Sequence, residues 1–105
     1  MAALTVHANP NPKSRTAIPY LLDVQSDLLS TLETRVVVPL YRKKTRALHP
    51  ISRLTPVVVF QGQTYVAMVP ELAGVSRREL GPPAGDLSPL RQDIIAALDL
   101  LFTGI

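Results

Sequence analysis

The sequence has no cysteine and no tryptophan, and aromatic side chains make up only 5% of its 105 residues. Without cysteine, the chain has neither a disulfide framework nor a thiolate metal site, which suits a reducing cytosol. His7 and His49 stand outside any HExxH or HxH pattern, so we expect no bound metal and no cofactor. His7 is then an ordinary strand residue, and His49 belongs to a basic loop.

Targeting and catalytic motifs are also missing. Residues 1–6 lack the basic region and long apolar stretch of a signal peptide, and no apolar run approaches the ~20 residues of a membrane span. Glycine-rich phosphate loops and the GxSxG motif do not occur, and the carboxylates form no obvious acid–base pair. These absences predict a cytoplasmic protein that contacts no membrane and is not an enzyme.

The composition favours a folded protein, because 47% of the residues are apolar and 18% are charged. A chain of this length predicts a single domain over residues 1–105. Ten prolines spread along the chain suit a many-turned β structure. Together with one C-terminal helix, they predict a mainly β fold, namely a small β-barrel with a helix attached.

Alternating or β-branched runs mark the predicted strands, which are residues 4–8, 20–24, 35–40, 56–60 and 63–68. The run 35–40 is apolar throughout, which predicts burial on both faces. Gln61 and Gly62 separate the last two strands and predict a two-residue hairpin turn. Beyond them, residues 69–74 suggest a turn or short helix, 77–80 a short edge strand and 81–85 a linker.

The C-terminal segment, residues 88–105, predicts a helix with Ser88 as N-cap and Pro89 at its first position. One apolar stripe at helical spacing consists of Leu90, Ile94, Leu98, Leu101 and Ile105. Ile95 and Phe102 add a second stripe beside it. Because a small domain has little interior to cover both stripes, we expect the helix to pack in the monomer and also to meet a partner.

Charge is distributed unevenly along the chain. Residues 1–53 hold eight Lys or Arg and three Asp or Glu, whereas residues 54–105 hold three and five. Half of the basic residues in the first part are Arg42, Lys43, Lys44 and Arg46. This cluster is either a solvated loop or a landing site for an acidic peptide or a phosphate backbone. Tyr41 is the only aromatic residue near the cluster, whereas nucleic-acid binding usually uses several aromatic side chains for base stacking. This favours an acidic protein partner over a nucleic acid.

Several stretches, taken in order, resemble the CcdB family of bacterial toxins. They are DVQSDLL at 23–29, RVVVPL at 35–40, LTPVV at 54–58, DLS at 86–88 and the segment 93–105 that ends in FTGI. The similarity is nearly continuous from about residue 18 to the end and is weakest in 41–48. The resemblance implies an SH3-like barrel of the CcdB and MazF type, working as a homodimer.

The resemblance further implies the toxin of a type II toxin–antitoxin pair, which binds the A subunit of DNA gyrase and traps the cleaved-DNA complex. The cognate antitoxin would wrap the toxin with a disordered acidic tail, and Arg42, Lys43, Lys44 and Arg46 would bind that tail by charge complementarity. Carried over by position, the gyrase-binding residues would be Leu28, Leu29, Asp99, Phe102, Thr103, Gly104 and Ile105.

Two of these positions depart from the family pattern. Thr103 stands where the gyrase poison has a tryptophan, and Asp99 stands where it has an asparagine. Threonine offers less contact area and no π face for a guanidinium. The chain could therefore poison gyrase through altered contacts, bind only its antitoxin as a degenerate toxin, or have another target. Gly104 also suits an ordinary helix C-cap, and Ile105 continues the core stripe.

An endoribonuclease of the MazF type, on the same barrel, is the enzymatic alternative. Arg15, Thr31, Arg35 and His49 supply the side chains that such a site would need. Nothing in their spacing favours this function, but residues that are distant in sequence can still be assembled in space.

Overall fold

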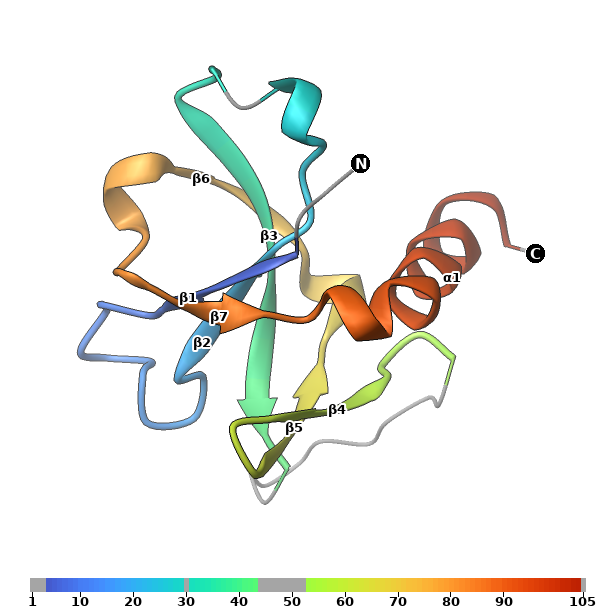
Figure 1. Ribbon diagram of the computed structural model, residues 1–105, viewed down its shortest axis with the longest axis horizontal. Helices are drawn as coiled ribbons and strands as arrows, with labels where there is room; N and C mark the ends of the chain where they lie inside the picture. The colour runs from blue at the N-terminus through green and yellow to red at the C-terminus, as the bar shows by residue number, and fades with distance from the viewer. Residues whose placement is uncertain (1–3, 30, 44–52, 105) are drawn as a thin grey trace.

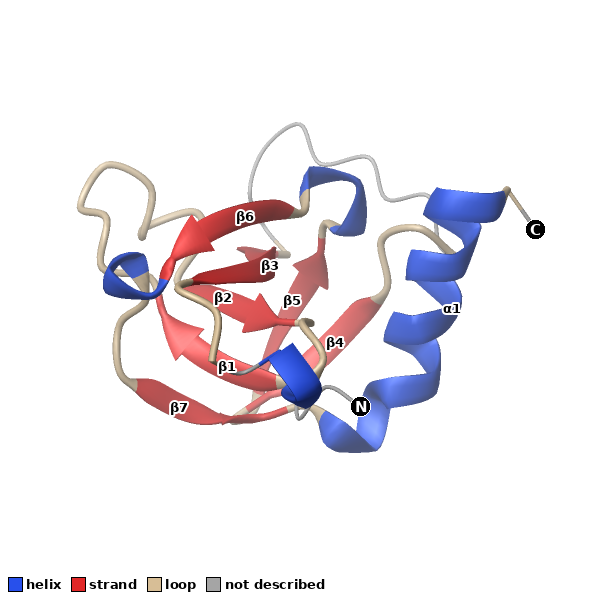
Figure 2. Cartoon of the chain, turned by 90° about the horizontal axis from the view of Figure 1, so that it is seen from above, coloured by secondary structure: helices blue, strands red, loops and turns tan. Residues whose placement is uncertain are grey.

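The computed structural model describes residues 4–29, 31–43 and 53–104. Its strands are β1 (Thr5–Ala8), β2 (Tyr20–Asp23), β3 (Thr34–Arg42), β4 (Val57–Phe60), β5 (Gln63–Ala67), β6 (Ala73–Ser76) and β7 (Pro83–Asp86). They form an antiparallel sheet in the order β4-β5-β3-β2-β1-β7, with β6 added beside β3. The sheet curls into a small barrel, and helix α1 (Arg91–Thr103) lies along one side of it (Figures 1 and 2). The predicted fold class is therefore confirmed.

Strand β3 is the central element of the sheet. One of its edges pairs with β2. The other edge pairs first with β6, as far as Val37, and then with β5 from Leu40 onward. Pro39, which has no N–H to donate, falls between these two partners. The side chains of Val37, Val38 and Leu40 are all buried, so the prediction of burial on both faces is confirmed.

The β4–β5 hairpin forms as predicted, with Phe60 opposite Gln63. Gln61 and Gly62 have φ angles of 51° and 78°, so both turn residues occupy the left-handed region. Two successive positive φ angles characterise the type I′ turn, whose twist matches that of the flanking strands. Glycine adopts this geometry without strain, whereas Gln61 adopts it at some cost.

The outer strands β4 and β7 approach each other and complete the barrel shape. The Phe60 ring lies over the backbone of Gly85, where an added Cβ would come within 2.8 Å of the ring. Beside it, Gln61 Nε2 donates a hydrogen bond of 2.9 Å to the carbonyl oxygen of Ala84. Side chains, rather than a ladder of backbone hydrogen bonds, therefore join these two strands.

Helix α1 closes one side of the core. Ile94 and Ala97 are fully buried, and Leu90, Leu98 and Leu101 pack against the same core cluster. The first predicted stripe is thus confirmed for its described members. Ile105, its last member, lies outside the described residues.

Two expectations for the segment 73–85 are wrong. Residues 77–79 form a 3-10 helix, η3 (Arg77–Glu79), instead of an edge strand. The cause is a capping box, in which the Ser76 hydroxyl accepts from the Arg78 amide and the Glu79 carboxylate accepts from the Ser76 amide. Residues 83–86 form β7 against β1 instead of a linker, because the partner strand selects an extended conformation despite the prolines.

Ser88 is not the N-cap of the long helix, which is a third correction. A 3-10 turn, η4 (Ser88–Leu90), precedes α1, and Pro89 lies within that turn. Asp86 stabilises the start of this turn, because its Oδ1 atom accepts from the Ser88 amide at 3.0 Å and from the Ser88 hydroxyl at 2.6 Å. The hydroxyl, followed by the amide, lowers the pKa of the Asp86 carboxyl.

Candidate functional site: an apolar protein-binding surface

One face of α1 carries large apolar side chains that the barrel does not cover. Ile95 is 40% exposed and Phe102 is 68% exposed, which confirms that the second predicted stripe is left outside the core. With 3.6 residues per turn, Arg91 and Asp99 lie on the same face, and the four positions span roughly 80° of the helix circumference. We call Arg91, Ile95, Asp99 and Phe102 the helix stripe.

The C-terminal end of α1 has a well-defined geometry. Gly104 has φ 75° and ψ 15°, and its amide donates to the Leu100 carbonyl at 2.9 Å, so it is a left-handed C-cap. The Thr103 hydroxyl donates to the carbonyl oxygen of Asp99 at 2.6 Å, one turn back along the helix. The threonine hydroxyl proton is therefore engaged by the helix itself, while Asp99 and Phe102 project from the exposed face.

A second apolar feature lies on the 3-10 helix η1 (Asp27–Leu29), which follows β2. Leu28 is 88% exposed and Leu29 is 48% exposed. We call these two residues the leucine ridge. Exposure of two adjacent leucines on so short an element is costly for an isolated monomer and is typical of a protein-binding surface.

A groove lies between α1 and the segment that leads into η1. The cavity has a volume of about 150 Å³ and is lined by Leu4, Val24, Ser26, Arg91, Ile94, Ile95 and Leu98. Ser26 directly precedes η1, whereas Ile95 belongs to the helix stripe. The described residues predicted to bind gyrase are all exposed, on η1 and on the last turn of α1. Ile105 lies outside the described residues.

The sequence analysis missed two residues of this surface. Ile95 stood out as part of an unburied stripe but was not included among the binding residues, and Arg91 was not singled out. Both line the groove. The helical spacing of four from Arg91 to Ile95 and from Ile95 to Asp99 was the signal that could have found them.

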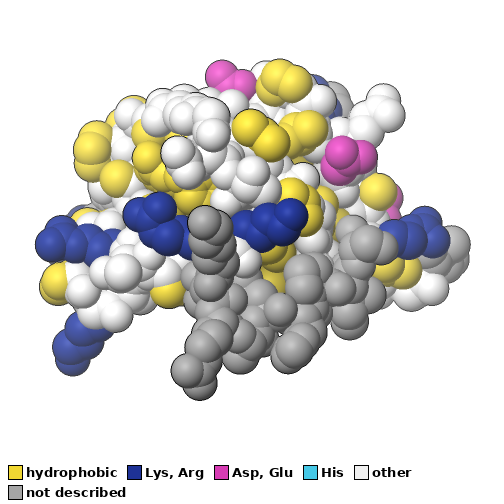
Figure 3. Space-filling model, turned by 90° about the horizontal axis from the view of Figure 1, so that it is seen from below, with side chains coloured by type: hydrophobic (Ala, Val, Ile, Leu, Met, Phe, Trp, Pro, Cys, Tyr) yellow, Lys and Arg dark blue, Asp and Glu magenta, His cyan; other side chains and the backbone are white. Residues whose placement is uncertain are grey.

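The predicted antitoxin-binding cluster is described only at Arg42 and Lys43, because Lys44 and Arg46 lie outside the described residues. Arg42 ends β3 and Lys43 follows it, and both line a cavity of about 330 Å³ together with residues 62–65 of the neighbouring hairpin. Arg42 Nε donates to the Thr16 carbonyl at 2.8 Å, which fixes its stem. Lys and Arg side chains form a band across the face seen in Figure 3, with acidic side chains towards its margin.

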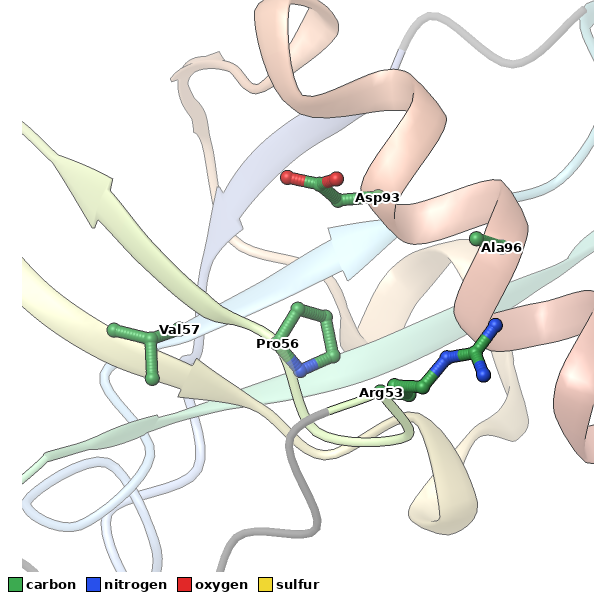
Figure 4. Close-up of a pocket in the computed structure, with 5 residues that line it drawn as sticks. All are labelled: Arg53, Pro56, Val57, Asp93 and Ala96. Atoms are coloured by element: carbon green, nitrogen blue, oxygen red, sulfur yellow. The ribbon is translucent and has the colours of Figure 1, made fainter.

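Another hollow, of about 340 Å³, lies where the chain re-enters the barrel beside α1. Arg53 extends toward the helix near Ala96, and Asp93 projects from the first turn of α1 (Figure 4). Pro56 and Val57 form the wall between them. This mixture of one cation, one anion and small apolar groups suits a surface contact with polar chains rather than a site for an enclosed small molecule.

Of the residues that a ribonuclease would need, the structure describes Arg15, Thr31 and Arg35. Arg35 is buried, and its Nε lies 2.8 Å from Asp23 Oδ2 in an ion pair. Arg15 and Thr31 are exposed, and His49 lies outside the described residues. His7 Nδ1 lies 3.1 Å from the Gly81 carbonyl oxygen, as suits a strand histidine. Within residues 4–29, 31–43 and 53–104, no cluster of His, Asp and Glu could hold a metal ion.

The fold and this surface define a small β-barrel protein that exposes apolar side chains on one helix and one 3-10 helix. Residues 4–104 match the model of a protein family described as CcdB protein. The chain therefore belongs to the CcdB family, and it is the toxin component of a toxin–antitoxin system. Among the described helices, none is long and apolar enough to cross a membrane.

Proposed function

We propose that this toxin is a cytoplasmic, non-enzymatic inhibitor that acts as a homodimer, binds the A subunit of DNA gyrase and traps the gyrase–DNA cleavage complex. Membership of the CcdB family supports the target. The observation that carries the proposal is the exposure of three large apolar side chains, Leu28, Leu29 and Phe102, at 88%, 48% and 68%. Aromatic side chains such as Phe102 are enriched at the cores of protein interfaces.

The helix stripe supports a modified way of binding the same target. The family tryptophan is replaced by Thr103, so the tip of the helix offers less contact area. Ile95, lying two turns before Phe102, adds apolar area beside the groove, and Arg91 and Asp99 add one charge of each sign. In our proposal the contact with gyrase therefore extends along α1, with Leu28, Leu29, Asp99, Phe102, Thr103, Gly104 and Ile105 as its core.

For the antitoxin, we propose that its acidic tail binds the basic cluster of Arg42, Lys43, Lys44 and Arg46. Support comes from the cavity that Arg42 and Lys43 share with the hairpin and from the excess of Lys and Arg over Asp and Glu in residues 1–53. Changing the four residues to alanine should weaken binding of an acidic peptide and reduce its dependence on salt. Unchanged affinity and an unchanged salt slope would contradict this assignment.

The test of gyrase poisoning is a DNA-cleavage assay with the full-length protein. Purified toxin is mixed with gyrase from its own host, ATP and supercoiled plasmid, and linear DNA is scored after the enzyme is denatured. We expect linear DNA to accumulate, and a variant lacking residues 103–105 should remain folded without producing it. A folded wild-type dimer that yields no linear DNA would refute the proposal, and cleavage of total RNA by the same preparation would establish the ribonuclease alternative.

A further inference from the structure

The leucine ridge has few contacts within η1 itself that could fix its conformation. Element η1 has three residues, and so short a 3-10 helix has little intrinsic stability. Its local hydrogen bonds are few: the Leu29 amide donates to the Ser26 carbonyl at 2.9 Å, the Leu28 amide to the Ser26 hydroxyl at 3.2 Å and the Leu32 amide to the Leu29 carbonyl at 3.1 Å. Apolar packing fixes the ridge only in part, because Leu28 is 88% exposed and Leu29 is 48% exposed. Another part of the chain must therefore position it.

Gln25 provides this link. Its side chain is directed inward, and the residue is only 8% exposed. Its Oε1 atom accepts from the Val36 amide of β3 at 3.0 Å, while its Nε2 atom donates to the carbonyl oxygen of Leu29 at 3.0 Å. One side-chain amide thus connects the central strand to the last residue of the ridge. Its orientation is fixed by its partners, since an N–H must face Oε1 and a carbonyl must face Nε2.

A buried ion pair between Asp23 and Arg35 holds the backbone of Gln25 in place. Asp23 Oδ1 accepts from the Gln25 amide at 2.9 Å, and Asp23 Oδ2 lies 2.8 Å from Arg35 Nε. Asp23 and Arg35 are both buried, on β2 and β3 respectively. In addition, the Val24 amide donates to the Val36 carbonyl at 3.0 Å. The segment that leads into η1 is therefore held to the sheet by side chains and backbone together.

We propose that Gln25, backed by the Asp23–Arg35 ion pair, is a positioning residue that fixes Leu28 and Leu29 in the orientation required to bind the target. This inference rests on the proposed function, in which the leucine ridge contacts gyrase. Gln25 is buried and acts through the ridge, not by touching the partner. Its contribution is to reduce the conformational freedom that the ridge would otherwise lose on binding.

The substitution Gln25→Glu isolates this role because it keeps size and shape while changing one group. One carboxylate oxygen can still accept from the Val36 amide. The other oxygen replaces Nε2 and faces the Leu29 carbonyl, so two acceptors oppose each other. We expect η1 to loosen while β3 keeps its contact. Protonation of the new carboxyl at low pH restores a donor, so the ridge should become ordered again below the pKa of the glutamate.

The experiment measures order and binding separately. Leucine methyl order parameters report Leu28 and Leu29, and amide hydrogen exchange reports Val36, in the full-length protein at neutral and at low pH. Affinity for the gyrase A subunit is measured at neutral pH. We expect lower methyl order with retained Val36 protection, recovery at low pH, and about tenfold weaker binding, the effect of losing one buried hydrogen bond. Gln92→Glu makes the same chemical change at an exposed position of α1 and should alter neither property.

Unchanged methyl order in folded Gln25→Glu would overturn the inference, as would lower order with unchanged gyrase affinity. If Gln25→Glu does not fold, Gln25→Met tests the same point without a charge, and it should loosen the ridge at every pH. Failure of the proposed function gives a different result, because wild-type protein would then not bind gyrase at all. In that case the methyl order and its recovery at low pH decide by themselves whether Gln25 positions the ridge.

Discussion

The two parts of the proposed binding surface are held in place by different means. At the tip of α1, conformation is set locally, by the left-handed C-cap at Gly104 and the Thr103 hydroxyl bonded one turn back. The leucine ridge on η1 is instead set from a distance, through Gln25 and the Asp23–Arg35 ion pair. The helix tip should therefore tolerate changes elsewhere in the barrel, whereas the ridge should depend on the sheet beneath it.

The largest expected effect comes from breaking the buried ion pair. Arg35→Ala leaves Asp23 buried without its cation, and removing one partner of such a pair costs about 3 kcal/mol. Denaturant unfolding should show this loss, and the leucine ridge should loosen while the tip of α1 stays ordered. Arg78→Ala removes an exposed arginine and serves as the control, with a change within ~0.5 kcal/mol. Equal stabilities of the two variants would contradict the buried-pair argument.

The next largest effects come from two neighbouring residues at the end of α1, one expected to contribute to binding and the other to stability. Phe102→Ala should weaken gyrase binding by about 2 kcal/mol, the scale of an interface anchor, with almost no change in unfolding free energy. Leu101→Ala, its neighbour, packs against the core and should show the reverse, losing about 2 kcal/mol of stability. Unfolding curves and gyrase-binding isotherms of both variants provide the check. A destabilised Phe102→Ala with normal binding would assign Phe102 to the core instead.

A smaller effect is expected for the C-cap. Gly104→Ala places a Cβ in open space, because no atom lies within 4 Å, so the cost of about 1 kcal/mol comes from the positive φ alone. Gly74→Ala on β6 also meets open space, but that residue has no positive φ, so it should leave the unfolding free energy nearly unchanged. Thermal unfolding of the pair measures the difference, and identical melting temperatures would show that the cap adds nothing.

The smallest effect concerns the titration of Tyr41 on β3. Tyr41 Oη donates to Glu71 Oε1 at 2.5 Å, and burial, followed by this hydrogen bond and the charge of Glu71, raises the pKa of Tyr41 to about 12. Because the pKa of the folded state is the higher one, the contribution of Tyr41 to stability is complete below pH 10 and is lost as the pH rises toward 12. Tyr41→Phe should remove that part of the alkaline destabilisation. Identical alkaline unfolding profiles would show that Tyr41 makes no such contribution.

Much of the fold followed from local pattern in the sequence. The β-branched run in β3, the Gln61–Gly62 turn and the apolar spacing of α1 each predicted their element, because propensity, turn chemistry and burial agree there. The errors fell where tertiary pairing or capping outweighed local preference. Strand β7 is extended because β1 pairs with it, and η3 is helical because Ser76 and Glu79 cap it.

The candidate site also combines features that the sequence predicts with features that only the tertiary structure decides. Sequence alone determined that α1 has two apolar stripes and that a small domain covers only one, since helical periodicity and the size of the core decide both. Only the tertiary structure placed Ser26, which precedes η1, and Ile95 of α1 along one groove, and directed Gln25 into the link between β3 and Leu29. These contacts join residues far apart along the chain, and no local pattern encodes which of them meet when the sheet curls.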